Sequence, residues 1–510
     1  MKKYYVTTAI DYVNARPHLG TAYEKIGADC LARYKRLAGY DTYFLMGTDE
    51  HSTNVEKEAR RQGKEPAAYA DEMAVEFENT WRDLHISYDQ FIRTTDPKHV
   101  RAVTHLFATI RSKGFIYEGT YRGLYCVSCE EFVVEKDLVD GKCPRHRTEP
   151  EHIEEKNSFF ALSKFGPRLR EHIETHPGFI RPETRRNEIL KVIEQGLEDV
   201  SVSRTGKTWG VPLPGAQGQV VYVWFDALIN YISALGYGET LGELYRRYWP
   251  ADCHVIGKDI TRFHCLIWPA MLMAAELPLP ESVFGHGFVY NRGEKMSKTI
   301  GNIVDPSALA GFFGADALRY LLLREIAFDR DGDFTVELFV ARYNADLAND
   351  LGNLFSRTLA MTNRYRGGEV PAWNGAAGGE FGRLTANVVS DYNSAMEALT
   401  FDVALQAMWR AVQAANRYVE EQKPWELSKR GDAAALDRCL RALLEVLRLC
   451  SVLCVPFMPV KAGEMRAQLG LNADVSRLSL GEAERPGDQG WTRVGKPTPL
   501  FPKLEVPEKD

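Results

Sequence analysis

The segment that decides the fold covers residues 4–21 and reads YYVTTAIDYVNARPHLGT. Its start, residues 4–9, is rich in aromatic and β-branched side chains and predicts a strand. After a short loop, residues 18–37 carry apolar side chains at helical spacing, and Gly39 ends that pattern. Residues 42–46 predict a second strand. This β-α-β order indicates a parallel, doubly wound sheet.

The character of the sequence changes twice farther along the chain. Residues 117–160 contain short strand-like pieces, turn residues and a cysteine cluster, which is typical of an insertion. Strands are expected again at 219–224, followed by a helix, and at 253–256. Residues 345–469 are almost wholly helical in pattern, so an α/β part is followed by an all-α part.

Composition excludes several classes of protein. The chain has 510 residues, of which 45% are hydrophobic and 26% charged, as in ordinary globular proteins of several domains. No apolar run is long enough to span a membrane, and the N-terminus has no signal-peptide core. The net charge of -6 gives no global attraction to nucleic acid, although local basic patches can coexist with it. Nine scattered or clustered cysteines predict a reduced, cytoplasmic protein.

The loop before the predicted helix ends in Pro17-His18-Leu19-Gly20-Thr21. A helix N-terminus presents unpaired N–H groups and the positive end of a dipole, so it can hold a phosphate. Gly20 would let a nucleotide approach the backbone, and His18 would offer a donor to developing negative charge. Taken alone, the same residues fit a helix cap with a solvated histidine.

A second motif, Lys295-Met296-Ser297-Lys298-Thr299, lies in a loop between Gly293 and Gly301. Two lysines on such a loop suit a clamp on a polyphosphate, because nucleotidyl transfer needs positive charge at its transition state. Alone, the motif fits an exposed basic turn equally well. The two motifs together, one in the first βα turn and one after a second α/β half, resemble those of class I aminoacyl-tRNA synthetases.

The cysteine cluster has the spacing of metal ligands. Two residues separate Cys126 from Cys129, and two separate Cys143 from His146. Three thiolates and one imidazole would close a tetrahedral site with no open position, which predicts one structural zinc ion per chain. The alternative is a set of buried cysteines beside a loop histidine.

The predicted helix 345–365 carries Asn349, Asn353 and Arg357 at intervals of four residues. At that spacing they drift by only about 40° per step, so they share one side of the helix. Two amides and a guanidinium could read unstacked bases, although most polar helix faces are merely solvated. Trp425 could stack on a base or fill the helical core.

Within class I, nearly the whole chain resembles methionyl-tRNA synthetases. The segments that carry the resemblance are 8–14, 47–51, 221–228, 256–260, His264, 268–270, the helix with Asn349, Asn353 and Arg357, and 423–425. The cysteine cluster is similar to that of members with a single zinc knuckle. The resemblance implies that the chain activates L-methionine with ATP, giving methionyl-adenylate and pyrophosphate, and then transfers methionine to the 3′ end of tRNA(Met).

The resemblance also implies roles for individual residues. Methionine would bind through Ala9, Ile10, Tyr12, Asp49, Trp224, Ala227, Leu228, Tyr231, Ile260 and His264, with Asp49 on the ammonium group and aromatic rings near the sulfur. ATP, with Mg²⁺, would contact His18, Gly20, Thr21, Arg204, Lys295, Ser297 and Lys298, of which His18, Thr21, Lys295 and Lys298 would be catalytic. The anticodon would contact Asn349, Asn353, Arg357 and Trp425, and zinc would bind Cys126, Cys129, Cys143 and His146.

The implied domain order begins with a Rossmann-type catalytic domain in two halves. Its parts are a first half at 1–116, a connective insertion with the zinc knuckle at 117–200, a second half at 201–290, a KMSKT loop and stem-contact region at 291–344, and an α-helical anticodon-binding domain with a tail at 345–510. Since the chain stops at Asp510, without a further domain, we expect a monomer. Thr21 stands where the family often has a second histidine, and so brings no positive charge.

Three alternatives share parts of this pattern. The synthetases for isoleucine, valine and leucine carry a large editing domain between the halves, for which the segment 117–200 is too short. A cysteine-specific synthetase would place zinc in the amino-acid pocket, whereas the clustered cysteines here lie outside the predicted pocket. A tRNA-binding paralogue without catalysis is favoured only by Thr21, and the intact lysine loop argues against it.

Overall fold

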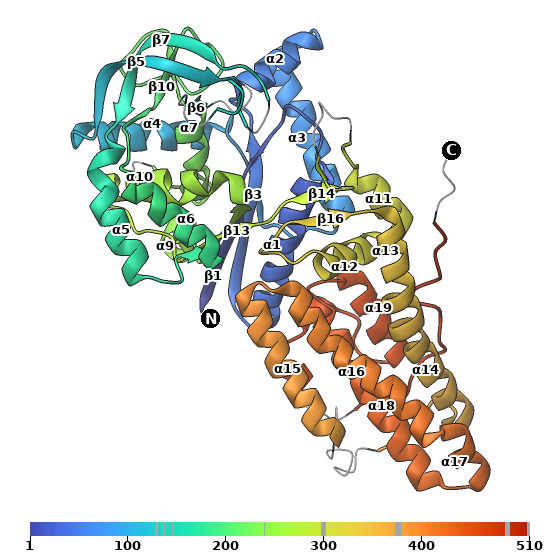
Figure 1. The fold of residues 1–510 in the computed structure, drawn as a ribbon. Coiled ribbons are helices and arrows are strands. Elements are labelled where there is room, and N and C mark those ends of the chain that lie inside the picture. Colours follow the sequence, from blue (N-terminus) through green and yellow to red (C-terminus); the bar gives the residue numbers. More distant parts are fainter. Residues whose placement is uncertain are drawn as a thin grey trace.

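The computed structural model describes residues 1–506 except 128–130, 134, 136–137, 145–146, 239, 297–301, 373–379 and 485–489. The side chains of 131–132, 295, 380–383 and 484 are also outside the description. An α/β part occupies one end of the molecule, and an elongated bundle of helices extends from it (Figure 1). In the described part of the chain, no helix combines the length and the apolar character that crossing a membrane requires.

A parallel sheet forms the centre of the α/β part. Its strands are β1 (Lys3–Thr8), β2 (Asp11–Tyr12), β3 (Asp41–Asp49), β4 (Gln90–Arg93), β8 (Ile180–Arg181), β12 (Cys253–Gly257) and β13 (Val283–His286). The order is β2-β3-β1-β12-β13-β8, with β4 also paired to β3, and every pair is parallel. The predicted doubly wound fold is therefore confirmed, because β1 lies between β3, from the first half of the catalytic part, and β12, from the second half.

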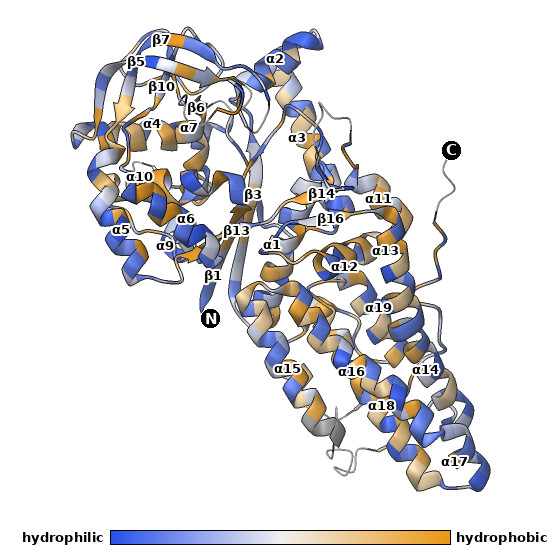
Figure 2. Ribbon diagram, viewed as in Figure 1, coloured by the Kyte–Doolittle hydropathy of each residue, from blue (hydrophilic) through white to orange (hydrophobic). Residues whose placement is uncertain are grey.

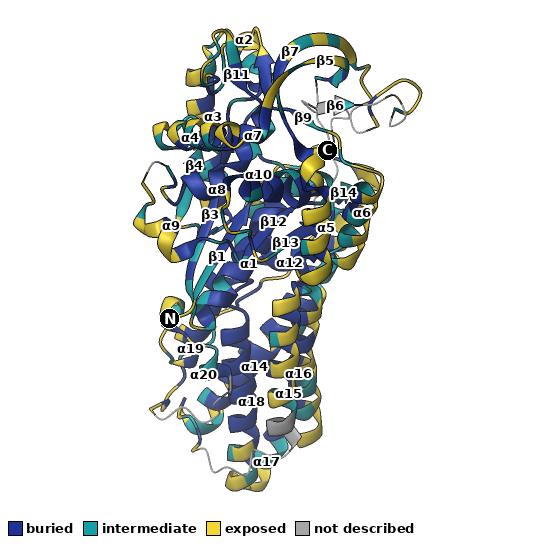
Figure 3. Ribbon diagram, turned by 90° about the vertical axis from the view of Figure 1, so that its left-hand side faces the viewer, coloured by how far each residue is buried: buried dark blue, intermediate teal, exposed yellow. Residues whose placement is uncertain are grey.

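Alternation along β1 explains why both faces of the sheet are covered. Val6 packs into one hydrophobic core and Tyr5 into a second, since successive side chains of a strand point to opposite faces. The first core receives α1 (Leu19–Leu37), α3 (Pro66–Asp83) and α12 (Ala315–Glu325), and the second receives α4 (Pro97–Ser112), α8 (Asn230–Ser233) and α10 (Trp268–Ala275). The strands are buried between these layers (Figure 3).

The insertion contains a separate sheet. Its strands are β5 (Ile116–Cys126), β6 (Glu131–Val133), β7 (Glu151–Phe160) and β9 (Val200–Ser201), in the antiparallel order β6-β5-β7-β9. Two helices, α5 (Gly166–Thr175) and α6 (Glu183–Glu194), flank the short strand β8. Because β8 pairs with β13, the range 117–200 returns to the central sheet before its end, which the polar sequence around it did not indicate.

The strand expected at 219–224 is wrong in its second half. Residues 219–221 form β11 (Gln219–Val221), which pairs with β10 (Ser203–Thr205) in a two-stranded antiparallel sheet outside the central one. A helix, α7 (Val223–Leu228), already begins at Val223. The aromatic and β-branched residues there suit a strand, but Trp224 stacks on Phe263, and tertiary packing overrides the local preference.

The C-terminal part is a helical bundle, as predicted. Its helices are α13 (Val336–Arg342), α14 (Asn353–Arg366), α15 (Glu380–Ala398), α16 (Phe401–Gln422), α17 (Pro424–Arg430), α18 (Ala433–Leu453) and α19 (Pro459–Leu469). Hydrophobic residues run along α18, which is buried among the other helices (Figures 2 and 3). The single α-helix expected at 345–365 is a π-helix from Tyr343 to Gly352 followed by α14. Apolar residues four apart fit both helix types, so their spacing could not separate them.

Helix α1 joins the α/β part to the bundle. Asp29, on α1, forms a fully buried ion pair with Arg319 of α12 at 2.6 Å. Arg319 also donates to the carbonyl oxygens of Pro456 and Phe457, at the end of α18, at 2.9 Å each. Near the end of α1, Lys35 pairs with Glu397 of α15 at 2.6 Å. The helix that begins at the first motif is therefore fixed to the bundle at two places.

Candidate active site

His18 is the N-cap of α1, and Thr21 closes the cap from inside the helix. The His18 Nδ1 accepts from the backbone N–H of Gly20 at 3.0 Å and of Thr21 at 3.3 Å. The Thr21 hydroxyl accepts from the His18 N–H at 3.0 Å and donates to the His18 carbonyl at 2.7 Å. Because Nδ1 accepts, the neutral ring carries its proton on Nε2. The motif thus forms the helix cap that the alternative interpretation predicted, and the cap also orients the imidazole.

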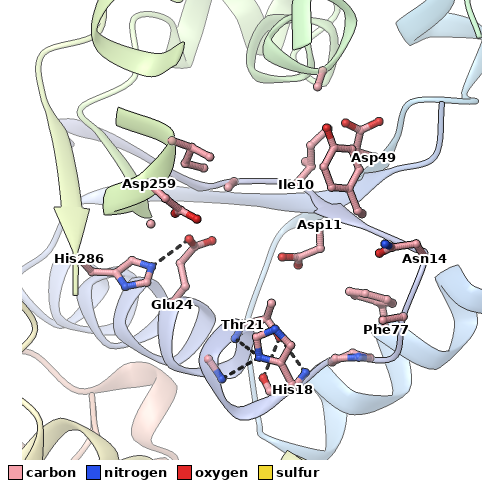
Figure 4. Close-up of a pocket in the computed structure, with 18 of the residues that line it drawn as sticks. Ile10, Asp11, Asn14, His18, Thr21, Glu24, Asp49, Phe77, Asp259 and His286 are labelled. Carbon is pink, nitrogen blue, oxygen red and sulfur yellow. Dashed lines mark hydrogen bonds and ion pairs between the residues drawn. The ribbon is translucent and has the colours of Figure 1, made fainter. Parts of the chain in front are cut away.

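A cavity of about 410 Å³ opens at this helix N-terminus, within the range of small-molecule sites. All ten residues predicted to bind methionine line it, together with His18, Gly20 and Thr21. Asp49 lies at the end of β3, in register with Tyr12 of β2, whereas Figure 4 shows the Glu24–His286 pair in another part of the cavity. The parallel sheet explains this convergence, because the carboxyl ends of β1, β3, β12 and β13 meet at one edge.

Aromatic rings form the apolar wall of the cavity. Trp224 stacks face to face on Phe263, with ring centroids 3.8 Å apart and an interplanar angle of 12°. Tyr12 meets Trp224 edge-on at 6.0 Å. Such rings offer both faces and edges to a polarizable sulfur atom.

His264 is a neutral member of this wall. Its Nδ1 lies 3.0 Å from the Ile260 carbonyl oxygen, which can only accept, so Nδ1 carries the proton. Its Nε2 then accepts from the Tyr231 hydroxyl at 2.7 Å. Burial lowers the pKa of His264 to about 4, which keeps the ring uncharged at neutral pH.

Several polar residues of the cavity were not predicted. Asp11, Glu24, Asp259 and His286 line it, and the Glu24 carboxylate lies 3.0 Å from the His286 Nε2 (Figure 4). A sequence signal existed, because Glu24 and Lys25 are charged residues within the mostly apolar segment 22–28. These groups can accept or donate hydrogen bonds to hydroxyl and amino groups of a ligand.

A second unpredicted group lies behind the apolar wall. Asp226, on α7, accepts from His51 Nδ1 at 2.7 Å and from His99 Nε2 at 2.9 Å, and it is fully buried. The His99 Nδ1 lies 2.8 Å from the Ser233 hydroxyl. Burial by itself raises the pKa of Asp226, but the two histidines bring it down to about 2. The ionised carboxylate ties α7, with its cavity residues, to the loop after Asp49.

The second motif approaches the first in space. Strands β14 (Val289–Asn291) and β15 (Glu294–Lys295) form the hairpin before it, and Met296 lines the cavity. The Leu19 N–H donates to the Val304 carbonyl at 3.0 Å, so the chain beyond the motif is fixed to the first turn of α1. Ser297, Lys298 and Thr299 lie outside the described residues, as does the side chain of Lys295.

Comparisons with known proteins bear directly on this arrangement. A sequence model described as "tRNA synthetases class I (M)" matches residues 4–152 and 146–359, and one described as "Anticodon binding domain of methionyl tRNA ligase" matches 372–504. The chain belongs to the methionyl-tRNA synthetase family. It is 44% identical to a methionine–tRNA ligase of Clostridium perfringens, covering 100% of this chain and 79% of that protein. For the ligase of Enterococcus faecalis the identity is 44%, with coverages of 99% and 77%.

Solved structures of family members have the same fold. The methionyl-tRNA synthetase of Mycobacterium tuberculosis in complex with methionyl-adenylate matches with a TM-score of 0.94 and 43% identity, over 98% of this chain and 100% of that one. The ligand-free form of that enzyme matches with a TM-score of 0.87 and 41% identity, over 99% of each chain.

Arg204 is not among the cavity residues of this synthetase. Its guanidinium lies over the rings of Tyr222 and Tyr125, at 4.4 and 5.0 Å, and donates to the Ser203 carbonyl at 2.7 Å. Arg204 is buried, and the ATP contact expected for it stays a prediction.

In the bundle, two of the residues assigned to the anticodon come together. The Arg357 guanidinium lies 5.1 Å from the centre of the Trp425 ring and pairs with Glu420 at 2.6 Å. Asn349 and Asn353 are exposed. Trp425 is half-buried against the hydrophobic core, which leaves part of its ring accessible.

The cysteine cluster is described in part. Cys126 and Cys143 are buried together in a small hydrophobic cluster of their own, with Val133 against it. Cys129 and His146 lie outside the described residues. Among the residues that are described, no group of three or more candidate ligands gathers around a common point.

We predict that Asp226→Asn destabilises this fold in a pH-dependent way. A depressed pKa means that the ionised carboxylate stabilises the folded state above its unfolded pKa and loses this effect as the pH falls through its folded pKa. From the shift to about 2, the loss at pH 7 is about 2 kcal/mol, and it should roughly halve at pH 3. Urea unfolding of the wild type and of Asp226→Asn, at pH 7 and at pH 3, measures the loss of unfolding free energy at each pH.

The matched control is Asp391→Asn. Asp391 pairs with Arg410 on the surface, where half of each side chain is exposed. This change should cost no more than about 1 kcal/mol at either pH. An equal loss for Asp226→Asn at both pH values would contradict the ionised bridge.

Proposed function

We propose that the cavity at the start of α1 binds methionine and ATP side by side and forms methionyl-adenylate. The methionine carboxylate oxygen forms a bond to the α-phosphorus of ATP, the bond to the bridging β-phosphate oxygen breaks, and pyrophosphate leaves. A hydroxyl group at the 3′ end of tRNA(Met) then attacks the carbonyl carbon of the adenylate, the bond to the phosphate oxygen breaks, and AMP leaves. One observation carries the proposal: a single cavity joins an aromatic wall, the buried carboxylate of Asp49 and a helix N-terminus with its histidine.

In this proposal methionine occupies the aromatic end. Its thioether contacts Tyr12 and Trp224, and Asp49 holds its ammonium group. The neutral His264 and the Tyr231 hydroxyl, which already hydrogen bond to each other, give the slot a polar point without a net charge. A slot of this kind suits a long, unbranched side chain with a weakly accepting sulfur atom.

The ATP phosphates would lie at the N-terminus of α1. His18 can donate from Nε2, Gly20 leaves the backbone accessible, and the helix dipole favours negative charge. The Thr21 hydroxyl already serves the cap, so its predicted contact with ATP would require it to exchange partners. Mg²⁺ would accompany the phosphates. Lys295, Ser297 and Lys298 remain the proposed source of the charge that closes over them.

Zinc would be held by the insertion. Cys126 and Cys143 fit such a site, because two buried thiols lie together in a cluster apart from the two main cores. Cys129 and His146 would complete a tetrahedral set, and the bound ion would hold the tip of the insertion together. No step of the reaction depends on it.

We further propose the domain order expected from the sequence, with the anticodon read at the end of the bundle by Asn349, Asn353, Arg357 and Trp425. A monomer is proposed as the active unit. A cytoplasmic location is supported by cysteines buried in hydrophobic cores, such as Cys30, Cys265 and Cys450.

The first experiment is amino-acid-dependent ATP–pyrophosphate exchange without tRNA, measured with each of the twenty amino acids. We expect exchange with methionine alone. His18→Asn should retain the helix cap, since asparagine also accepts at that position, and should lower the exchange rate by about 10²–10³-fold. His18→Ala should lower the rate similarly and also cost about 1 kcal/mol of stability through the lost cap. A folded protein without exchange for any amino acid would support a tRNA-binding paralogue instead.

Metal analysis tests the zinc site independently of activity. We expect one zinc ion per chain in the purified protein and none in Cys143→Ser, because three ligands hold zinc poorly. Cys450→Ser is the matched control, since Cys450 is equally buried but lies in α18, and it should retain the ion. A folded native protein without zinc would rule the site out.

Separating charging from adenylation tests the anticodon residues. Trp425→Ala should lower kcat/KM for tRNA by about 10- to 100-fold, as expected for one lost stacking contact, and leave pyrophosphate exchange unchanged. Asn353→Ala should act in the same direction. Asn387→Ala changes another exposed asparagine of the bundle, on α15, and should have no effect. Parallel losses of exchange and charging would show that these residues act through folding.

A further inference from the structure

A lysine lies fully buried beneath the cavity. Lys25, on α1, has no exposed side-chain surface. Its ammonium donates to the Ala9 carbonyl at 2.9 Å, to the Asp11 carboxylate at 3.0 Å and to the Glu24 carboxylate at 2.7 Å. An ammonium group has three donors, so every one is used.

The partners of Lys25 belong to different walls of the cavity. Ala9 and Asp11 come from the segment after β1, and Glu24 comes from α1. The other Glu24 oxygen bonds to His286 Nε2 at 3.0 Å, and the His286 Nδ1 bonds to the Gly287 carbonyl at 2.7 Å. These five residues all line the cavity, and Figure 4 labels Asp11, Glu24 and His286. One continuous set of bonds thus fixes the first βα loop, α1 and the end of β13 to one another.

The charges in this network depend on Lys25. Burial raises the pKa of Asp11, Lys25 opposes that effect, and the result is about 6. Burial would also raise the pKa of Glu24, but Lys25 and then His286 bring it down to about 2. Burial disfavours the charge of Lys25 itself, yet the two carboxylates raise its pKa, so it stays protonated.

The other groups that face this network supply little compensation. His264 is neutral because burial lowers its pKa to about 4, and burial raises the pKa of Tyr231, so both are uncharged near pH 7. Asp259 adds a further carboxyl group to the same part of the cavity. Without the ammonium, Asp11 and Glu24 would be two buried carboxylates, and among the described residues that bond to them His286 alone could offset their charge. Such a pair does not remain doubly ionised.

We propose that Lys25 is a positioning residue for methionine adenylation, acting through Asp11, Glu24 and the Ala9 carbonyl on the walls that receive methionine and ATP. The inference rests on the proposed function. Lys25 does not touch the substrates, and its effect comes from holding the walls in register and keeping both carboxylates charged. Displacement of such a wall by about 1 Å can cost about 100-fold in rate.

The test compares two buried lysines of the same helix. Lys25→Met keeps the length of the side chain and removes the charge, and it should lower the rate of methionine-dependent pyrophosphate exchange by about 10- to 100-fold. The acid limb of the pH profile of its exchange rate should move to higher pH by about one to two pH units, because the carboxylates lose their counter-ion. Lys35→Met breaks the pair with Glu397 at the other end of α1 and should lower thermal stability without moving the profile.

A double variant keeps the test decisive if Lys25→Met does not fold. Lys25→Met with Asp11→Asn removes one carboxylate together with the ammonium, so the buried charge is balanced again. It should fold, exchange faster than Lys25→Met where that variant can be assayed, and lack the acid limb that Asp11 gives the wild type. An acid limb at the wild-type pH in either Lys25 variant would overturn the proposal. Absence of exchange in the wild type would instead refute the proposed function.

Discussion

The unpaired backbone N–H groups at the start of α1 are the constraint on which the rest of the site depends. A helix cannot satisfy these groups itself, and here the side chain of His18 takes up two of them while the hydroxyl of Thr21 closes the cap from the other side. The cap fixes the imidazole in one orientation and one tautomer. The parallel pairing of β1 with β3 and β12 then brings Asp49, the loop after β12 and the second motif to the same edge of the sheet. The walls of the cavity therefore all meet at the N-terminus of α1.

Much of this could be predicted because it follows from local pattern. Alternating apolar residues, a helix with a clear stop and two separated motifs were sufficient to predict the doubly wound sheet. The resemblance supplied the ten residues predicted to bind methionine, all of which line the cavity. What could not be predicted depends on partners distant in sequence. In the sequence nothing distinguishes Asp226 from other polar residues, because its partners His51 and His99 are more than 100 residues away along the chain. The short strand β8 and the early start of α7 are likewise decided by packing against β13 and Phe263.

The same helix that presents the cap also carries the connection to the bundle. Lys25 is bonded under the cavity, Asp29 is paired with Arg319, and Lys35 is paired with Glu397, so contacts succeed one another along α1. Arg319 continues this line to the carbonyl groups at the end of α18. A buried pair such as Asp29–Arg319 adds little net stability relative to apolar packing, but removing one partner is costly, and so the pair restricts how α1 and α12 can pack. A bundle fixed in this way cannot move far without moving α1.

The distribution of charge in the cavity favours the proposed role of the lysine loop. Asp11, Glu24, Asp49 and Asp259 all line the cavity, which by itself would repel a polyphosphate. Lys25 offsets part of this charge from below, but it is buried and its donors are used. Arg16 also lines the cavity, but it pairs with Glu76 at 3.4 Å. The helix N-terminus and His18 attract phosphate only over a short range. In the proposed function the carboxylates bind amino and hydroxyl groups of the substrates. The phosphates therefore need further positive charge from outside the cavity wall. Met296 lines the cavity, and Val304 bonds to the first turn of α1, so we expect the lysines of the motif 295–299 to supply it.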